Sequence, residues 1–323
     1  MTRKLVYKDF KSSLPNETVK KTHQDQIAKA LAAKSHHFVT RELAQRQERL
    51  PQLKMIAEFL AKQTGLKPAA RKLAPKPTNI AAPKVPRLAH PIFYTGSCHM
   101  VDISWAESPF ISGFWGGGQA TPTNDASGDG APISTDEVRL SVEAGTAPPY
   151  ETAGATTAYG YVGTYLSVPS DPTLVASLPS QAWLQISASP SLHYLPWFTT
   201  TSIWPESTPV TLNLGVSVLF NVYDNSPQWN LISQTWSAET YFYQAQGSSD
   251  EAGVWTNVVV PVKAYMPVVS LNDNYGILIV ITAQAAAYGA STGTVAIGSD
   301  CFANIQATVP AIQIDAFSNP PPS

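Results

Sequence analysis

The stretch PVTLNLGVSVLFNVYD, residues 209–224, decides the fold class of this chain of 323 residues. Apolar side chains occupy every second position from Val210 to Val222, and most of the positions between them hold Thr, Asn, Gly or Ser. Strict alternation predicts a long β-strand with one buried face and one solvent-facing face.

Weaker alternation marks most of residues 93–323. The segments are EVRLSVE, AYGYVGTYLSV, QAWLQISAS, SAETYFYQAQ, GVWTNVVVPVKAYM, YGILIVITAQA, TGTVAIGSDCFANIQATV and AIQIDAF, separated by Gly, Pro, Ser and Asn clusters. Helical periodicity does not interrupt them. About eight to ten strands in this order predict a mainly β fold, an antiparallel β-sandwich that is jelly-roll-like or Greek key.

Residues 1–65 are predicted to form a basic helical arm. Within QLKMIAEFLAKQT, apolar residues recur at spacings of three and four; Pro51 suits the start of a helix and Gly65 its end. Upstream, one or two further helices are expected from residue 17 onward, with a weak break at AKSHHF. The apolar stripe is narrow, so we expect these helices to need the β domain, a neighbouring subunit or a ligand.

Residues 66–92 are predicted to be an extended linker that is rich in Pro, Ala and Lys. Six prolines remove backbone donors and forbid a regular helix. The linker holds six cations and no acid, and each cation could neutralise one phosphate or contact an acidic partner: Lys67, Arg71, Lys72, Lys76, Lys84 and Arg87.

Charge separates the two parts of the chain more sharply than the net charge of −2 suggests. Residues 1–92 hold 19 of the 21 Lys and Arg and 6 of the 23 Asp and Glu, a formal charge of +13. Residues 93–323 hold Arg139 and Lys263 against 17 acids, a formal charge of −15. A cationic segment on an acidic body predicts an anionic partner, either nucleic acid or the sandwich of another copy. An arm that lies folded against its own sandwich in a lone molecule would overturn the case for assembly.

The expected function is therefore a non-enzymatic structural protein that self-assembles into a particle or fibre, as a shell or capsid does. Residues 1–92 would contact neighbouring subunits or nucleic acid. The first ten residues lack the apolar core of a signal peptide, and no apolar run is long enough to span a membrane. We expect synthesis in the cytoplasm and a homo-oligomer, with a virion or particle as its destination.

The alternative is a glycan- or receptor-binding β-sandwich head anchored through the N-terminal helices. Its candidate residues lie in HYLPWFTTTSIWPES, where Tyr194, Trp197 and Trp204 are bracketed by prolines and hydroxyl side chains. Aromatic rings on a loop stack on sugars or anchor interfaces. The plainer interpretation, which we favour, is a loop that folds back to cap the end of the sandwich.

The stretch DASGDGAPISTD, residues 125–136, resembles half of a calcium-binding loop. Asp125, Ser127, Asp129 and Asp136 fall at ligand positions one, three, five and twelve of the EF-hand pattern. Flanking helices are missing, and position twelve holds Asp rather than Glu. We therefore expect a solvated surface loop and no cofactor, with a calcium ion as the alternative.

Other chemistry finds little support in the sequence. A nucleophile elbow, a zinc-binding helix and a phosphate-binding loop are all missing, which leaves a hydrolase built on two carboxylates as the enzymatic alternative. GFWGGG, residues 113–118, is expected to form a tight turn or bulge. Cys98 and Cys301 are expected to be reduced and half-buried, with a bridge between them as the alternative.

Overall fold

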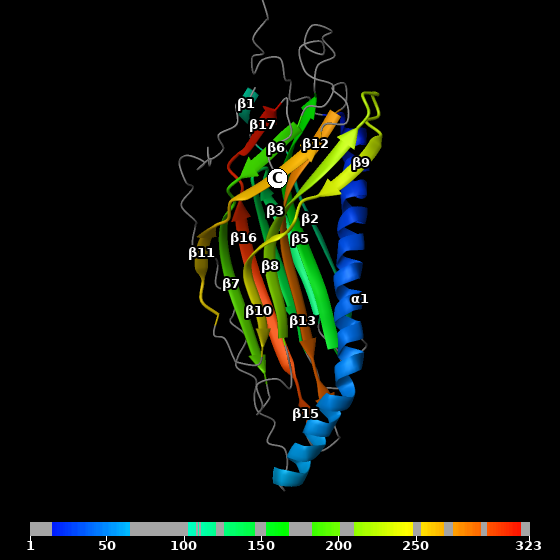
Figure 1. Cartoon of the computed structure of the whole chain (residues 1–323), viewed down its shortest axis with the longest axis vertical. Coiled ribbons are helices and arrows are strands. Elements are labelled where there is room, and N and C mark those ends of the chain that lie inside the picture. Colours follow the sequence, from blue (N-terminus) through cyan, green and yellow to red (C-terminus); the bar gives the residue numbers. More distant parts are fainter. Residues whose placement is uncertain are drawn as a thin grey trace, which may run out of the picture.

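A computed structural model describes residues 15–64, 103–107, 109, 111–120, 126–145, 153–167, 183–200, 210–247, 253–267, 274–291 and 296–317. These residues form one helix, α1 (Glu17–Thr64), and 17 strands, β1 to β17, in antiparallel sheets (Figure 1). The predicted fold class, a mainly β antiparallel sandwich preceded by an N-terminal helical segment, is confirmed.

Three sheets hold nearly all of the strands, and we name them A, B and C. In spatial order, sheet A contains β10 (Thr240–Gly247), β8 (Val210–Tyr223), β13 (Asn274–Tyr288), β5 (Ala153–Ser167) and β2 (Ile111–Ala120), and β9 (Leu231–Trp236) also pairs with β8. Sheet C contains β11 (Thr256–Val259), β7 (Ser191–Thr200), β16 (Ser299–Thr308), β4 (Glu137–Ala144) and β3 (Ala126–Ser134). Sheet B contains β1 (Ile103–Glu107), β17 (Ile312–Phe317), β6 (Trp183–Ala188) and β12 (Val262–Pro267), and β14 (Ala290–Ser291) pairs with β15 (Ala296–Ile297).

Strand pairing follows a nested order that identifies the sandwich as a jelly roll. Strand β4 pairs with β16, β5 with β13, β7 with β11, and β8 with β10, so later strands return along earlier ones in reverse. Successive pairs alternate between sheets C and A. One long antiparallel hairpin is thus rolled into two facing sheets, which is the jelly-roll arrangement.

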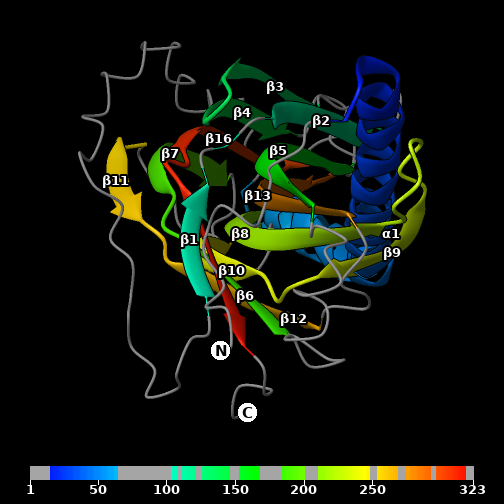
Figure 2. The ribbon, with the colours of Figure 1, turned by 90° about the horizontal axis from the view of Figure 1, so that it is seen from above.

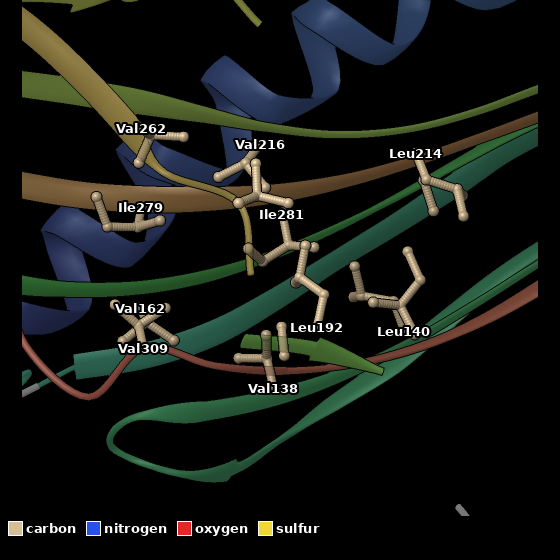
Figure 3. Close-up of a cluster of buried hydrophobic side chains, with 14 of the residues drawn as sticks. Val138, Leu140, Val162, Leu192, Leu214, Val216, Val262, Ile279, Ile281 and Val309 are labelled. Carbon is tan, nitrogen blue, oxygen red and sulfur yellow. The ribbon is translucent and has the colours of Figure 1, made fainter. Parts of the chain in front are cut away.

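The main core lies between the facing sheets. Figure 3 shows Leu214 and Ile281 from sheet A directed toward Leu140 and Leu192 from sheet C. All four side chains are buried, and the even-numbered apolar positions of β8 from Val210 onward belong to the same cluster. The alternation in residues 209–224 therefore identified the core-facing side of this strand correctly.

Sheet B continues sheet C across a row of prolines. Strand β6 is separated from β7 at Pro190, β11 from β12 at Pro261, and β16 from β17 at Pro310. The register places the three breaks side by side, because Ala188 pairs with both Val262 and Ile312, just beyond them. Proline lacks the amide hydrogen that a sheet ladder needs, so each strand is interrupted at the same level. This is one reason why the structure has more strands than the eight to ten expected.

The prediction that one face of β8 meets solvent is wrong, because side chains of α1 and of the segment that follows β9 cover that face. Helix α1 lies along the outer side of sheet A, mainly against β5 and β2 (Figures 1 and 2). Asn213, Ser217 and Asn221, on the face predicted to be wet, are buried. Of the three supports expected for the helical arm, the structure shows the chain's own β domain.

Helix α1 is continuous where the sequence suggested separate helices. AKSHHF lies within it, and Pro51 is an interior residue rather than a helix start. Figure 1 shows α1 bending toward its lower, lighter blue end, which contains the proline, as expected when an interior hydrogen bond is lost. The side chain of Asn16 caps the N-terminus by accepting a hydrogen bond from Val19 N at 2.9 Å. The described part of α1 ends at Thr64, and the predicted stop at Gly65 lies outside the described residues.

GFWGGG is part of strand β2, so the predicted turn is wrong. A Cβ on Gly116 would overlap the carbonyl oxygen of Gly128 in β3, and a Cβ on Gly117 would meet the ring of Trp115. The glycines therefore allow close approach of strands and rings rather than a change of direction.

Cys301 is a free, fully buried thiol rather than a half-buried one. Its pKa is raised, chiefly because burial disfavours the thiolate. Cys98, the other predicted thiol, lies outside the described residues.

Candidate functional site

The contact between α1 and sheet A contains polar side chains that sequence analysis did not single out. His23, Ser35 and Glu42 face the sheet and are buried. Buried polar groups cost stability unless they are hydrogen-bonded, so their partners decide how firmly the helix is held. All three have partners on the β domain.

His23 is enclosed by three aromatic residues near the start of α1. Its Nδ1 accepts a hydrogen bond from the hydroxyl of Tyr165 at 3.1 Å, and its Nε2 donates one to the carbonyl of Trp229 at 3.2 Å. Its ring also stacks on Tyr223 with centroids 4.0 Å apart. Desolvation lowers the pKa of His23 below its ordinary value, so the neutral imidazole is favoured.

The turn between β8 and β9 positions Trp229 against His23. Asp224 accepts hydrogen bonds from the backbone N–H and hydroxyl of Ser226, and from the backbone and side chain of Asn230. These bonds lower the pKa of Asp224 to about 2. Trp229 has a φ of 49°, in the left-handed region, and the hydrogen-bonded turn holds it in this uncommon conformation.

Further along α1, Glu42 is the most extensively bonded of the three. Its Oε2 accepts hydrogen bonds from the hydroxyls of Tyr288 at 2.5 Å and Thr211 at 3.2 Å, and Arg41 pairs with its Oε1 at 2.9 Å. Tyr288 lies in β13 and Thr211 in β8, so these two hydrogen bonds hold Glu42 and its part of α1 against the sheet. Ser35 accepts a hydrogen bond from Thr157 at 2.6 Å.

Lys34 joins α1 to the strands at the other side of sheet A. Its ammonium group lies 3.2 Å from Glu239 and 4.5 Å from the ring centre of Trp236. Apolar contacts of Ile27 and Leu31 with sheet A lie close by. The docking of α1 is thus largely apolar and hydrogen-bonded rather than a pairing of a positive face with a negative one.

The burial of His23 makes the docking of α1 sensitive to pH. Because the pKa of His23 is lower in the folded protein than in the unfolded chain, the unfolded chain binds more protons between the two pKa values. The contribution of His23 to the free energy of unfolding is therefore expected to be fully present above pH 6.5, the ordinary pKa of histidine. It should fall as the pH is lowered from 6.5 through the pKa of His23 in the folded protein. Urea unfolding between pH 7.5 and pH 5 measures this slope.

Two variants test whether His23 causes this pH dependence of the free energy of unfolding. His23→Gln keeps a donor for the Trp229 carbonyl and is expected to flatten the pH dependence. The ionisable groups that face His23, Tyr165 and Tyr223, stay neutral because burial raises their pKa values. His36 is exposed on the same helix, so His36→Gln should leave the slope unchanged. An unaltered slope in His23→Gln would contradict the assignment.

The six cations predicted to contact nucleic acid or a partner lie outside the described residues: Lys67, Arg71, Lys72, Lys76, Lys84 and Arg87. The exposed side of α1 carries a mixed set of charges, in which Lys21, Lys29, Arg41, Arg49, Lys54 and Lys62 alternate with Glu17, Asp25, Glu48 and Glu58. The linker therefore carries positive charge alone, whereas the exposed side of the helix carries charges of both signs.

Two of the three predicted stacking residues are not on a loop. Tyr194 and Trp197 belong to strand β7, and their side chains are 8% and 7% exposed. Tyr194 packs in the main core, and Trp197 packs with Leu195 and Phe302. The interpretation of this part of the segment as a capping loop is wrong as well. Trp204 lies outside the described residues.

The stretch predicted to be a solvated surface loop, with calcium binding as the alternative, forms a strand and turn over its described residues, 126–136. Ser127 and Asp129 lie in β3, Asp136 follows it in the turn to β4, and Asp125 is outside the described residues. A strand rises about 3.3 Å per residue, which spreads these oxygens along the edge of sheet C instead of around one centre. Across the described residues, no three His, Cys, Asp or Glu side chains gather as metal ligands would. Helix α1, the one helix among the described residues, has no apolar stretch long enough to cross a bilayer.

No family model and no curated protein matches the sequence. Two solved structures show a weak likeness. A structure of infectious bursal disease virus, Gt strain, has 8% identity and a TM-score of 0.20, covering 71% of this chain and 47% of that chain. TmCBM61 in complex with β-1,4-galactotriose has 8% identity and a TM-score of 0.12, covering 63% of this chain and 87% of that chain. This chain thus spans about half of the viral one. At these scores neither likeness carries an argument.

Proposed function

We propose that this chain is a structural subunit that assembles into a particle or fibre. The jelly roll is the building block, and residues 66–92 contact a polyanion or neighbouring copies. The observation that supports the proposal is the separation of charge, with six cations and no acid in the linker and 17 acids against two cations in residues 93–323.

The structure changes which part of the arm can make such contacts. Residues 17–64 are the third layer of the folded unit, beside sheet A, and are not an arm that reaches away from it. Lying on its own sandwich, α1 supplies no support for assembly. The proposal therefore rests on the linker cations, which remain a prediction from the sequence.

Neutralising the linker tests the proposal. Replacing its six Lys and Arg with Gln is expected to abolish binding of a labelled 20-nucleotide single-stranded RNA, measured by fluorescence anisotropy at several NaCl concentrations. Each lost phosphate contact should reduce the slope of log affinity against log salt by about 0.7. Assembly is followed by light scattering and electron microscopy.

A matched variant distinguishes this segment from charge in general. Lys21, Lys29, Lys54 and Lys62 are exposed on α1, and replacing these four with Gln should leave RNA affinity within about twofold. Deleting α1 would be a poor test, because sheet A would lose its cover. A wild-type chain that does not bind RNA and stays monomeric at low and high salt would contradict the proposal.

A further inference from the structure

Strand β11 is an edge of sheet C that lies far from α1. Among the described strands it pairs on one side only, with β7 (Figures 1 and 2). The stretch GVWTNVVV, residues 253–260, contains no charged residue and no proline, and its pairing with β7 shows no register shift. Such an edge presents unpaired backbone groups that another strand can use.

The other sheet edges carry the devices that discourage strand addition. Strand β3 contains Asp129, Pro132 and a register shift, and β12 contains Lys263 and Pro267. Strand β1 contains Glu107, β9 and β10 have register shifts where they pair with β8, and α1 lies against β2. Charges, prolines, bulges and a covering helix all hinder edge-to-edge pairing. Among the described edges of sheets A, B and C, β11 has none of these four features, and its one protection is its length of four residues.

The side chains of β11 are also incompletely covered. Val258 packs against the core between the sheets, whereas Val254, which lies just before β11 begins, is 67% exposed. Val259 on the opposite face is exposed as well. An added strand would therefore bury apolar side chains on both faces.

The backbone of β11 shows which groups are free for such a strand. Val260 N donates to the carbonyl of Pro190 at 3.0 Å, so the backbone of Val260 faces β7. Backbone groups alternate in direction along an antiparallel strand. Those of Trp255, Asn257 and Val259 therefore point away from β7, toward the open edge.

We infer that β11 pairs with β11 of a second copy of this chain, antiparallel about a two-fold axis at Asn257. This register places Asn257 opposite itself and Trp255 opposite Val259, so each outward N–H meets a carbonyl of the other copy. Val254 then lies opposite Val260 and loses its exposure. The two C sheets become one continuous sheet. This inference deepens the proposed function by naming a contact between subunits, and it rests on that proposal only for its place in an assembly.

Charge favours a second copy over other occupants. An RNA strand or an acidic peptide would need cations along the edge, and a basic peptide would need acids; residues 253–260 contain neither. Two uncharged strands satisfy each other without them. Because both sandwiches are strongly acidic, salt should strengthen this contact by screening their repulsion, the opposite of its effect on RNA binding. A contact this short should be weak by itself, with a Kd above about 1 μM, and be multiplied by repetition in an assembly.

Val259→Pro tests the pairing directly. Proline removes an N–H that faces the open edge and leaves the bonds to β7 intact, because Val259 points away from that strand. Sedimentation equilibrium in 0.5 M NaCl without RNA should show dimers of the wild type at high concentration and at least about tenfold weaker association of Val259→Pro. Val259→Thr keeps the N–H and the branched shape, and should associate within about twofold of the wild type.

Val254→Lys supplies a second test if the proline variant proves unstable. Position 254 is largely exposed, so the folded chain should tolerate lysine, while the pairing would bury the added charge and weaken association at least about tenfold. Undiminished association of either folded variant, or a wild type that stays monomeric at high concentration and salt, would overturn the inference. A wild type that dimerises through β11, does not bind RNA and associates equally well after the linker cations are replaced with Gln keeps this inference and removes the proposed role of residues 66–92. If the wild type binds RNA and both variants self-associate as strongly as the wild type, the proposed function is kept and this inference is removed.

Discussion

Replacing Leu31 with aspartate is expected to lower the free energy of unfolding by about 4 kcal/mol or more. Leu31 is 0% exposed and packs under α1 in a cluster that includes Tyr159, Leu219 and Leu278 of sheet A. The variant loses the buried leucine and places a carboxylate where the described contacts are apolar. Urea unfolding followed by circular dichroism at 222 nm and by tryptophan fluorescence measures the change for helix and sandwich separately.

Ala33→Asp is the matched control for this change. Ala33 is two residues away on the exposed side of α1, so the same side chain enters the same turn of helix but meets water. Its cost should stay below about 1 kcal/mol, the scale of helix propensity. A similar loss in both variants would show that helix propensity, and not contact with sheet A, explains the effect.

Replacing Gly128 with valine is expected to cost about 3 kcal/mol or more. A Cβ at this position of β3 would overlap the carbonyl oxygen of Thr157 in β5, so a backbone rather than a mobile side chain would have to move. The carbonyl of Gly128 in turn occupies the space that a Cβ on Gly116 would need. Three strands from both sheets would shift together, and thermal unfolding measures the loss.

Ser127→Val separates this overlap from the properties of valine itself. Ser127 precedes Gly128 in β3 and is exposed, and valine suits a strand. Its effect should stay within about 0.5 kcal/mol of the wild type. Equal stability of Gly128→Val and the wild type would contradict the close approach of β3 to β5.

The fold was predictable where one face of a strand meets the same environment along its whole length, because the periodicity of the sequence then identifies that face. Alternation from Val210 to Val222 correctly located the face that packs in the core. It could not show that α1 covers the other face, because Asn213 and Ser217 look the same whether water or a helix is beside them. Partners for His23 and Glu42 depend on strands far away in the sequence. The one signal for this contact in the sequence was that both the helical arm and one face of β8 carry polar side chains.

Errors at the candidate sites share a physical cause, which is that turn-forming residues also occur in strands. Gly116 and Gly128 lie in strands because two backbones meet there, and not because the chain turns. Asp129 and Ser127 kept the spacing of a calcium loop while lying in an extended edge strand. Pro196 beside Trp197 suggested a loop, yet both residues belong to β7. Pairing across a sheet overrode local preference in each case.

The prolines at positions 190, 261 and 310 have a mechanical consequence. A β-sheet resists folding across its strands because its ladder of amide bonds is continuous, and here the ladder is cut at one level in three neighbouring strands. Sheet B is thereby joined to sheet C along a crease. Ile186, Val262 and Ile314 of sheet B nevertheless pack in the same core as Leu140 and Leu214, so this crease bends the β layer around one continuous core.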